Sequence, residues 1–205
     1  WWDQIEKWRK IDCLKFKQGK GAINPQYAIQ RLYDLTQKRK QEVYISTEVG
    51  QHQMWAAQYF KYTEHRQWLN SGGLGTMGFS LPATIGAQLG RPDKTLVNIN
   101  GDGSFIMNIQ ELVPAVTMKL PLKIFIINNM YLGMVRQWQE MFFQKRYSAV
   151  DYHDNPDFAK LAEAFGATGI RVERPEEVRP ALEQAKKIED GPVVIDFIVD
   201  EEENV

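Results

Sequence analysis

The chain has 205 residues, of which 43% are hydrophobic and 25% charged, with a formal net charge of −1 at pH 7. This length supports one globular domain with a single sizeable core. The near-zero charge gives no electrostatic reason to expect binding to nucleic acid. No apolar run approaches the roughly 20 residues of a membrane span, so we expect no membrane association. The lone Cys13 excludes an intrachain disulfide and suits a reducing compartment.

The first forty residues are polar and favour helix. Their apolar residues share one helical face: Trp1, Trp2, Ile5 and Trp8. This face predicts packing on a neighbouring domain more than insertion at a membrane interface. No signal peptide is visible, and Trp1 is not a natural first residue, so we expect a piece of a longer protein. The pair Asn24-Pro25 then predicts a helix start, with asparagine as the N-cap and proline at the first position.

Short apolar segments alternate with amphipathic ones along the rest of the chain. The predicted strands are 43–46, 96–99, 122–127, 168–172 and 193–199. The predicted helices include 80–90, 105–120, 157–166 and 175–188. In the second of these, one buried face is expected from Phe105, Ile109, Leu112, Val113 and Val116. This order predicts an α/β fold with a doubly wound, mostly parallel sheet flanked by helices.

Three charged features are expected to be structural. Asp196 lies within the last predicted strand, and we expect it at a strand end or at an edge of the sheet. Residues 201–203, three glutamates, predict a solvated tail. The basic run 38–40 predicts a solvated helix end.

Polar residues follow two consecutive predicted strands. Gly101-Asp102-Gly103-Ser104 comes after the strand 96–99, and Asn128-Asn129 comes after the strand 122–127. Glycines allow a sharp turn and close approach to a ligand, and the start of the next helix favours an anion such as a diphosphate. Asp102 and Asn129 offer oxygen ligands that suit Mg²⁺ or Ca²⁺. An ordinary turn is the alternative for either motif alone, but two such motifs at one sheet edge favour a binding site.

The pair of motifs resembles the signature of thiamine-diphosphate (ThDP) enzymes, in which the aspartate and the second asparagine hold Mg²⁺. Segments 50–58, 71–79 and 133–139 narrow the resemblance to the catalytic subunit of the acetolactate synthase (acetohydroxyacid synthase) family. These motifs occur in the family's order, and the similarity covers essentially the whole chain. A nicotinamide-binding fold is disfavoured because Gly-Asp-Gly lacks the Gly-x-Gly-x-x-Gly spacing.

The resemblance implies a set of site residues. Cofactor contacts are expected from Val49, Gly50, Gln51, His52, Gly75, Met77, Gly101, Asp102, Gly103, Ser104, Asn129, Tyr131, Leu132, Gly133 and Met134. The implied metal ligands are the side chains of Asp102 and Asn129 and the backbone carbonyl of Tyr131. On residue type alone, His52 would be a surface histidine at a helix start.

The resemblance also implies that three side chains act in catalysis: Met77, Met134 and Trp138. The resemblance makes Met77 the wedge that folds ThDP into a V shape, which places its amino group beside the reactive carbon. It places Trp138, with Met134 on the same helix face, where the second substrate is selected. On residue type alone, all three would be core residues. Ser80 and Thr84 depart from the glycine and alanine expected there, and we expect changed helix packing with an intact site.

The resemblance also implies the parent protein. It would condense pyruvate with a second 2-ketoacid, with loss of CO₂, in branched-chain amino-acid biosynthesis. Residues 1–23 would lead in from an absent middle domain that binds FAD, and residues 24–205 would form the diphosphate- and metal-binding domain. A homodimer or homotetramer, a small regulatory subunit, and a cytoplasmic (bacterial) or plastid location are implied. The resemblance also implies that the glutamate that activates the cofactor lies on a separate pyrimidine-binding domain of the neighbouring subunit. We therefore expect this chain alone to be inactive.

Two alternatives remain open from the sequence. One is another ThDP enzyme that acts on 2-ketoacids: a decarboxylase, a carboligase or a pyruvate oxidase. The other is a non-catalytic interaction module that retains the domain for metal-diphosphate binding or dimer contacts. A Trp138 substitution that alters the preference for 2-ketobutyrate would favour acetolactate synthase over a decarboxylase.

Overall fold

The computed structural model describes residues 1–39 and 42–205. The described residues form a parallel sheet of six strands in the order β2-β1-β3-β4-β6-β5. The strands are β1 (Val43–Thr47), β2 (Trp68–Leu69), β3 (Thr95–Gly101), β4 (Lys123–Asn128), β5 (Thr168–Val172) and β6 (Val193–Ile198). The predicted parallel α/β fold is confirmed. Strand β2 was not predicted because two residues carry no periodic signal.

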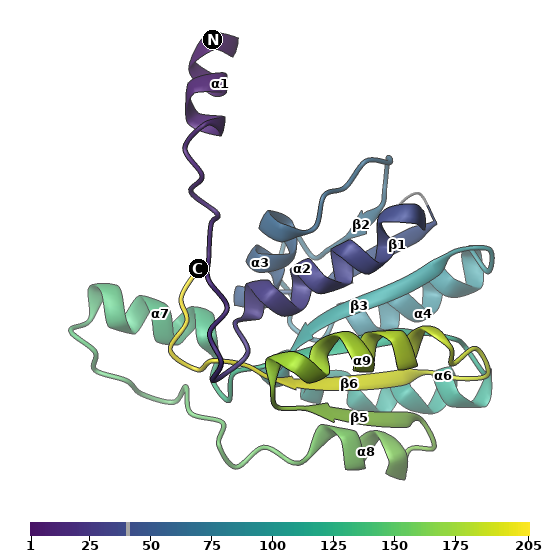
Figure 1. Cartoon of the computed structure of the whole chain (residues 1–205). Coiled ribbons are helices and arrows are strands. Elements are labelled where there is room, and N and C mark those ends of the chain that lie inside the picture. Colours follow the sequence, from purple (N-terminus) through teal and green to yellow (C-terminus); the bar gives the residue numbers. More distant parts are fainter. Residues whose placement is uncertain (40–41) are drawn as a thin grey trace.

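Helices cover both faces of the sheet (Figure 1). Three lie on one face: α2 (Pro25–Thr36), α3 (Gln51–Tyr59) and α9 (Pro175–Lys186). The other face carries α4 (Ser80–Gly90), α6 (Leu112–Thr117) and α8 (Phe158–Ala164). Strand residues alternate between the two cores, as the adjacent Ile126 and Ile127 of β4 show by packing in opposite ones. Burial on both faces explains the nearly continuous apolar strands.

The carboxyl ends of the strands lie at one edge, and the helices that follow β1, β3 and β4 begin there. Helix α3 follows β1, the short α5 (Asp102–Phe105) follows β3, and α7 (Gly133–Phe142) follows β4. The register pairs Gly101 of β3 with Ile127 of β4. The two polar motifs therefore end up as neighbours, as the sequence predicted.

The helix expected after Ser104 is divided into three parts. Helix α5 continues into the 3₁₀ segment η2 (Ile106–Glu111) and then into α6. Asn108, with φ −134° and ψ 30°, is not helical and kinks the chain. Phe105 and Leu112 are buried as predicted, but Val113 is 52% exposed. The prediction for Val113 was wrong: Leu112 and Val116 still pack on the core, and Val113 lies about 100° around the helix from Leu112, on the solvent side.

The N-terminal segment extends away from the sheet (Figure 1). Helix α1 (Trp2–Arg9) has no buried residue, and Trp1 is 82% exposed. The segment meets α3 only further on, where Tyr59 donates a hydrogen bond to the carbonyl of Leu14 at 3.1 Å. The predicted packing of the tryptophan face on another domain stays a prediction. Of the basic run, Lys38 is exposed in η1 (Gln37–Arg39), whereas residue 40 lies outside the described residues.

Near the C-terminus, the expectation for Asp196 was wrong, and the expected solvated tail was wrong only at Glu203, since Glu201 and Glu202 are exposed. Asp196 is fully buried because β6 lies between β4 and β5, and Asn128 Nδ2 donates to its Oδ1 at 3.0 Å. Burial raises the pKa of the Asp196 carboxyl to about 6. Glu203 is half-buried and not part of a fully solvated tail, since Gln26 Nε2 donates to it at 2.6 Å.

Candidate cofactor and metal site

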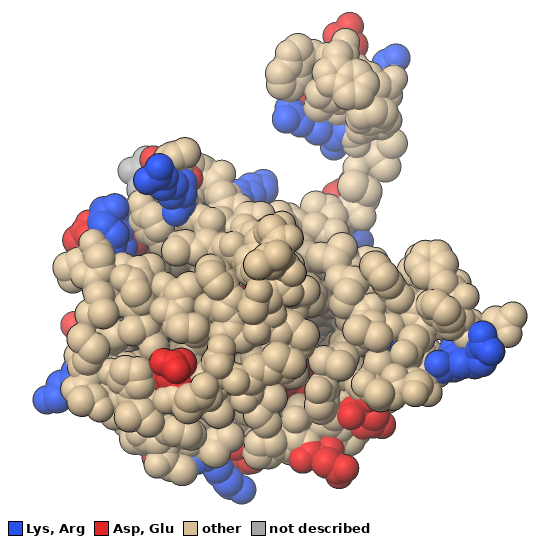
Figure 2. Space-filling model, turned by 180° about the vertical axis from the view of Figure 1, so that it is seen from behind, with Lys and Arg blue, Asp and Glu red and all other residues tan. Residues whose placement is uncertain are grey.

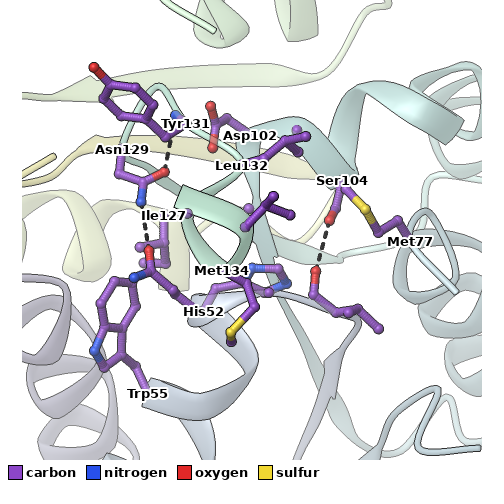
Figure 3. A pocket seen from close by; sticks show the side chains of 17 residues that line it. His52, Trp55, Met77, Asp102, Ser104, Ile127, Asn129, Tyr131, Leu132 and Met134 are labelled. Atoms are coloured by element: carbon purple, nitrogen blue, oxygen red, sulfur yellow. Dashed lines mark hydrogen bonds between the residues drawn. The ribbon is translucent and has the colours of Figure 1, made fainter. Parts of the chain in front are cut away.

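A cavity of about 130 Å³ lies at the carboxyl edge of the sheet (Figure 3). Every residue predicted to contact the cofactor lines it except Gly75. Asn129 and Tyr131 lie on one side of the cavity in the view of Figure 3, and Met77 and Ser104 on the other. The structure thus brings together side chains from four separate stretches of sequence.

Asp102 and Asn129 present oxygens at this edge from neighbouring strand ends. Asn129 Nδ2 donates to Gln51 Oε1 at 2.9 Å, and Asn129 Oδ1 accepts from the backbone N–H of Tyr131 at 3.3 Å. This pair of bonds fixes the orientation of the amide. The centre of the Tyr131 ring lies 4.8 Å from the Arg136 guanidinium carbon. The role of the Tyr131 carbonyl as a metal ligand stays a prediction.

The Asp102 carboxyl is 1% exposed, and its electrostatics fit a cation site. Burial raises its pKa to about 7, against the opposing effect of hydrogen bonds from the backbone N–H groups of Asp102 and Gly103. Among the described residues, no lysine or arginine lines the cavity. A carboxylate, an amide oxygen and a carbonyl are the donors that Mg²⁺ prefers. The residues present therefore fit a hard divalent cation.

Two helices begin at the cavity, an arrangement that would favour an anion there. Gln51 and His52 begin α3, and Gly133 and Met134 begin α7, and all four line the cavity. Free N–H groups and the helix dipole favour negative charge at such positions. With no lysine or arginine among the described lining residues, a diphosphate here would need these N–H groups and a metal ion for its charge balance.

His52 is a buried neutral imidazole and not the surface residue that its type suggests. It is 4% exposed, and burial lowers its pKa to about 3. Within the described chain, its Nε2 has no hydrogen-bond partner. A buried polar atom that lines a cavity without a partner calls for a ligand or a water molecule.

Glycines let the backbone come close to these side chains. A Cβ on Gly101 would lie 2.7 Å from His52 Nδ1, and one on Gly133 would lie 1.9 Å from Gln51 Oε1. A Cβ on Gly50 or Gly103 would also meet a side chain at 2.8 Å. Side chains at these four positions would displace the cavity wall, which explains the glycine-rich motifs.

The Met77 side chain reaches the cavity from the loop before α4. Gly75 has a φ of +68° and lies outside the lining, although its Cβ position is 3.6 Å from Val49 Cγ2. On the same side of the cavity, Ser104 Oγ donates to the Val49 carbonyl at 3.2 Å. Gly75, which was predicted to contact the cofactor, thus lies beside the cavity and is not part of its wall.

Trp138 lies outside the cavity. It is 58% exposed on α7, one turn beyond Met134, which does line the cavity. The core position that its residue type alone would suggest is excluded within the described chain. An exposed indole close to a ligand site fits a role in contacting substrate, which stays a prediction.

Four residues at the site were not predicted. Trp55, Ile127 and Val135 line the cavity, and Asn155 Nδ2 donates to Asp102 Oδ2 at 3.0 Å. Trp55 follows Gln51 by four positions, so helical spacing could have found it. Asn155 follows no such pattern, because the long loop 143–157 carries it back to the site.

A larger hollow of about 710 Å³ lies at the opposite edge of the sheet. It is lined by the first residues of three strands, Val43, Thr95 and Lys123, together with parts of α2 and α9. It contains none of the predicted site residues. In parallel sheets, ligands bind at the carboxyl edge, so the smaller cavity is the candidate site.

Residues 48–197 match the family described as thiamine pyrophosphate enzyme, C-terminal TPP binding domain. The chain belongs to this family. Thiamine pyrophosphate is another name for ThDP, so the predicted family is confirmed, and the cavity is where that family's cofactor would be expected. None of the helices in the described part of the chain combines the length and apolarity needed to cross a membrane.

Curated relatives narrow the family further. The chain is 44% identical over 205 residues to the acetolactate synthase large subunit of Haemophilus influenzae. It is 45% identical to the isozyme 3 large subunit of Escherichia coli, and 47% identical to the chloroplastic acetolactate synthase 1 of Nicotiana tabacum. Each match covers the whole chain but only 35%, 36% and 31% of the relative, respectively. The chain spans about a third of the length of these relatives.

Proposed function

We propose that this chain is the ThDP- and Mg²⁺-binding part of an acetolactate synthase catalytic subunit. The parent enzyme would condense pyruvate with a second pyruvate or with 2-ketobutyrate, with loss of CO₂, in branched-chain amino-acid biosynthesis. The observation that carries the proposal is the convergence of Asp102 and Asn129 on one cavity. The relatives named acetolactate synthase support the choice of reaction.

The chain's own groups would hold the diphosphate and the metal. Asp102, Asn129 and the Tyr131 carbonyl would bind Mg²⁺, which would in turn bind the diphosphate oxygens. N–H groups at the starts of α3 and α7 would add hydrogen bonds, with the neutral His52 as a further donor. When bound, ThDP supplies the nucleophilic carbon at which a 2-ketoacid loses CO₂.

Met77 and Trp138 would act on geometry and selectivity. The Met77 side chain would support the centre of the folded cofactor, an arrangement that uses proximity for catalysis. Trp138 would contact the second 2-ketoacid and, with Met134, set the preference between pyruvate and 2-ketobutyrate. This role of Trp138 requires that another domain of the full-length enzyme covers the exposed indole and closes the substrate site.

Other domains would complete the site. The cavity of about 130 Å³ is below the roughly 300–1,000 Å³ of a typical small-molecule site. We place the pyrimidine half of the cofactor on the neighbouring subunit of a homodimer or homotetramer. Residues 1–23 would lead in from an FAD-binding middle domain, and residues 24–205 would form the domain described here.

The surface fits this assembly. The side covered by α4 and α6 has few charged side chains away from its rim (Figure 2). It carries exposed Leu89, Val113 and Met118. Apolar surface of this kind marks protein contacts. A small regulatory subunit is proposed because two of the relatives are named large subunits, and a bacterial cytoplasmic or plastid location because of the organisms in which they occur.

The reaction is tested with the full-length protein that carries this chain. We expect acetolactate from pyruvate in the presence of ThDP and Mg²⁺, and none from the Asp102→Ala variant. The isolated chain of residues 1–205 should produce none. Formation of acetaldehyde or acetyl phosphate in place of acetolactate would instead assign another ThDP enzyme class.

A further inference from the structure

The loop that presents Met77 turns at two glycines and is held by side chains from outside it. It runs from Gly75 to Phe79 between β2 and α4, and Gly75 and Gly78 adopt φ values of +68° and +83°. Glycine adopts such values without a steric penalty. Three side chains that do not line the cavity hydrogen-bond to the backbone of residues 76–80: Ser71, whose Oγ accepts from the Thr76 N–H at 2.9 Å, Glu48 and Asn108. Ser71 lies just before the loop in the sequence, whereas Glu48 and Asn108 reach it from distant parts of the chain.

Asn108 holds the loop from η2. Its Nδ2 donates to the Gly78 carbonyl at 2.7 Å. The same residue has the non-helical backbone that kinks the α5-η2-α6 segment. A Cβ on Gly78 would lie 2.7 Å from Asn108 Nδ2, so the contact is close. The kink and the amide together bring η2 against the loop.

Glu48 holds the end of the loop from the segment that follows β1. It is fully buried at the carboxyl end of β1, and its carboxyl accepts from Ser80 Oγ at 3.0 Å. The backbone N–H groups of Gly78, Phe79 and Ser80 also face this carboxyl and favour its charged form. The next residue, Val49, lines the cavity. Glu48 therefore connects the cavity wall directly to the start of α4.

We propose that Glu48 and Asn108 are positioning residues that clamp the Gly75–Phe79 loop and thereby fix the Met77 side chain at the cofactor site. This inference rests on the proposed function for the role of Met77. The clamp itself rests on the Asn108–Gly78 and Glu48–Ser80 hydrogen bonds. Neither side chain touches the cavity, so each acts through the loop.

The clamp is tested first without cofactor, by hydrogen exchange of the peptide covering residues 75–82 in the full-length protein. We expect Asn108→Ala to speed exchange in this peptide about fivefold, the effect of losing one hydrogen bond. Gln110→Ala is the matched control, because Gln110 Nε2 donates to Asn108 at 3.1 Å without reaching the loop. It should leave the peptide's exchange unchanged.

The effect on Met77 is tested in the loaded enzyme with Glu48→Gln and Asn108→Ala. Glu48→Gln keeps the volume and places an amide against the N–H groups. At saturating ThDP, we expect kcat to fall about fivefold in each variant. The KM for pyruvate should stay within about twofold, and the near-ultraviolet circular dichroism of bound ThDP should change.

The same exchange measurement is made on Glu48→Gln. If neither Asn108→Ala nor Glu48→Gln changes the exchange of residues 75–82, the clamp is overturned. Faster exchange with unchanged kcat and unchanged dichroism would overturn the link to Met77. A wild-type enzyme that neither binds ThDP nor forms acetolactate would instead refute the proposed function, and the exchange measurement would still decide whether the two side chains hold the loop.

Discussion

Asn155 Nδ2 donates a hydrogen bond to Asp102 Oδ2 at 3.0 Å, although 53 positions separate the two residues. Backbone pairing makes this contact possible. Tyr152 N–H donates to the Met130 carbonyl at 2.8 Å, and Leu132 N–H donates to the Val150 carbonyl at 2.8 Å. The loop after α7 is therefore fixed alongside residues 130–132, and Asn155 orients the carboxyl proposed to bind the metal.

Replacing Asn155 should weaken metal binding without unfolding the domain. Partners of metal ligands commonly contribute about 10- to 100-fold in affinity, so we expect Asn155→Ala to raise the Kd for Mg²⁺ at least about tenfold. A Mg²⁺ titration of the full-length protein with ThDP measures this. Asp154→Ala, at an exposed neighbour, is the control. Equal Mg²⁺ affinity in the two variants would contradict the role of Asn155.

Adding a single methyl group at Gly133 should disturb the site. The new Cβ would lie 1.9 Å from Gln51 Oε1 and 2.6 Å from Asn129 Nδ2, so Gly133→Ala must separate this hydrogen-bonded pair. We expect a loss of about 1–3 kcal/mol in stability and a ThDP affinity at least about tenfold lower. Gly73→Ala is the matched control, since its Cβ meets nothing within 4 Å. Thermal unfolding and ThDP titration together check both effects.

The parts of the site that follow strands could be predicted, and the parts that depend on loops could not. Asp102 and Asn129 come directly after apolar strands, so a parallel sheet necessarily places them at one edge. Asn155 and the kink at Asn108 follow no periodic pattern. Asp196 was placed wrongly because the order of strands in the sheet, which buries β6, cannot be derived from one strand's composition.

The proposed role of Trp138 predicts a change in substrate preference with little change in stability. The indole is 58% exposed, so Trp138→Leu should cost less than about 1 kcal/mol in unfolding free energy. We expect the preference for 2-ketobutyrate over pyruvate to fall roughly tenfold, since apolar contact with the larger substrate is lost. Competition between the two substrates in the full-length enzyme measures the ratio. An unchanged ratio would place Trp138 outside the substrate path.

Glu48 should make stability depend on pH. Burial raises its pKa from 4.5 to about 7, opposed mainly by the hydrogen bond from Ser80. The folded state therefore binds the proton more tightly than the unfolded state, and stability falls as pH rises from about 4.5 to about 7. The expected loss from this group is about 3 kcal/mol.

Urea unfolding at pH 5 and pH 7.5, without cofactor or metal, tests this dependence. Glu48→Gln carries no titrating carboxyl, so its stability should fall less than that of the wild type over the same interval. Buried Asp102 and Asp196 contribute in the same direction in both proteins. A wild-type and a variant with the same pH dependence would show that Glu48 stays charged in the folded protein.

A calorimetric titration with ThDP in the presence of Mg²⁺, comparing wild type with Asp102→Ala, tests most directly whether this cavity binds the cofactor through Asp102. The full-length protein provides the complete site, and the isolated chain shows how much of it is preformed. We predict saturable binding by the full-length wild type that is lost in Asp102→Ala while the variant remains folded. Equal ThDP affinity in the two proteins would contradict the assignment of Asp102 and of this cavity.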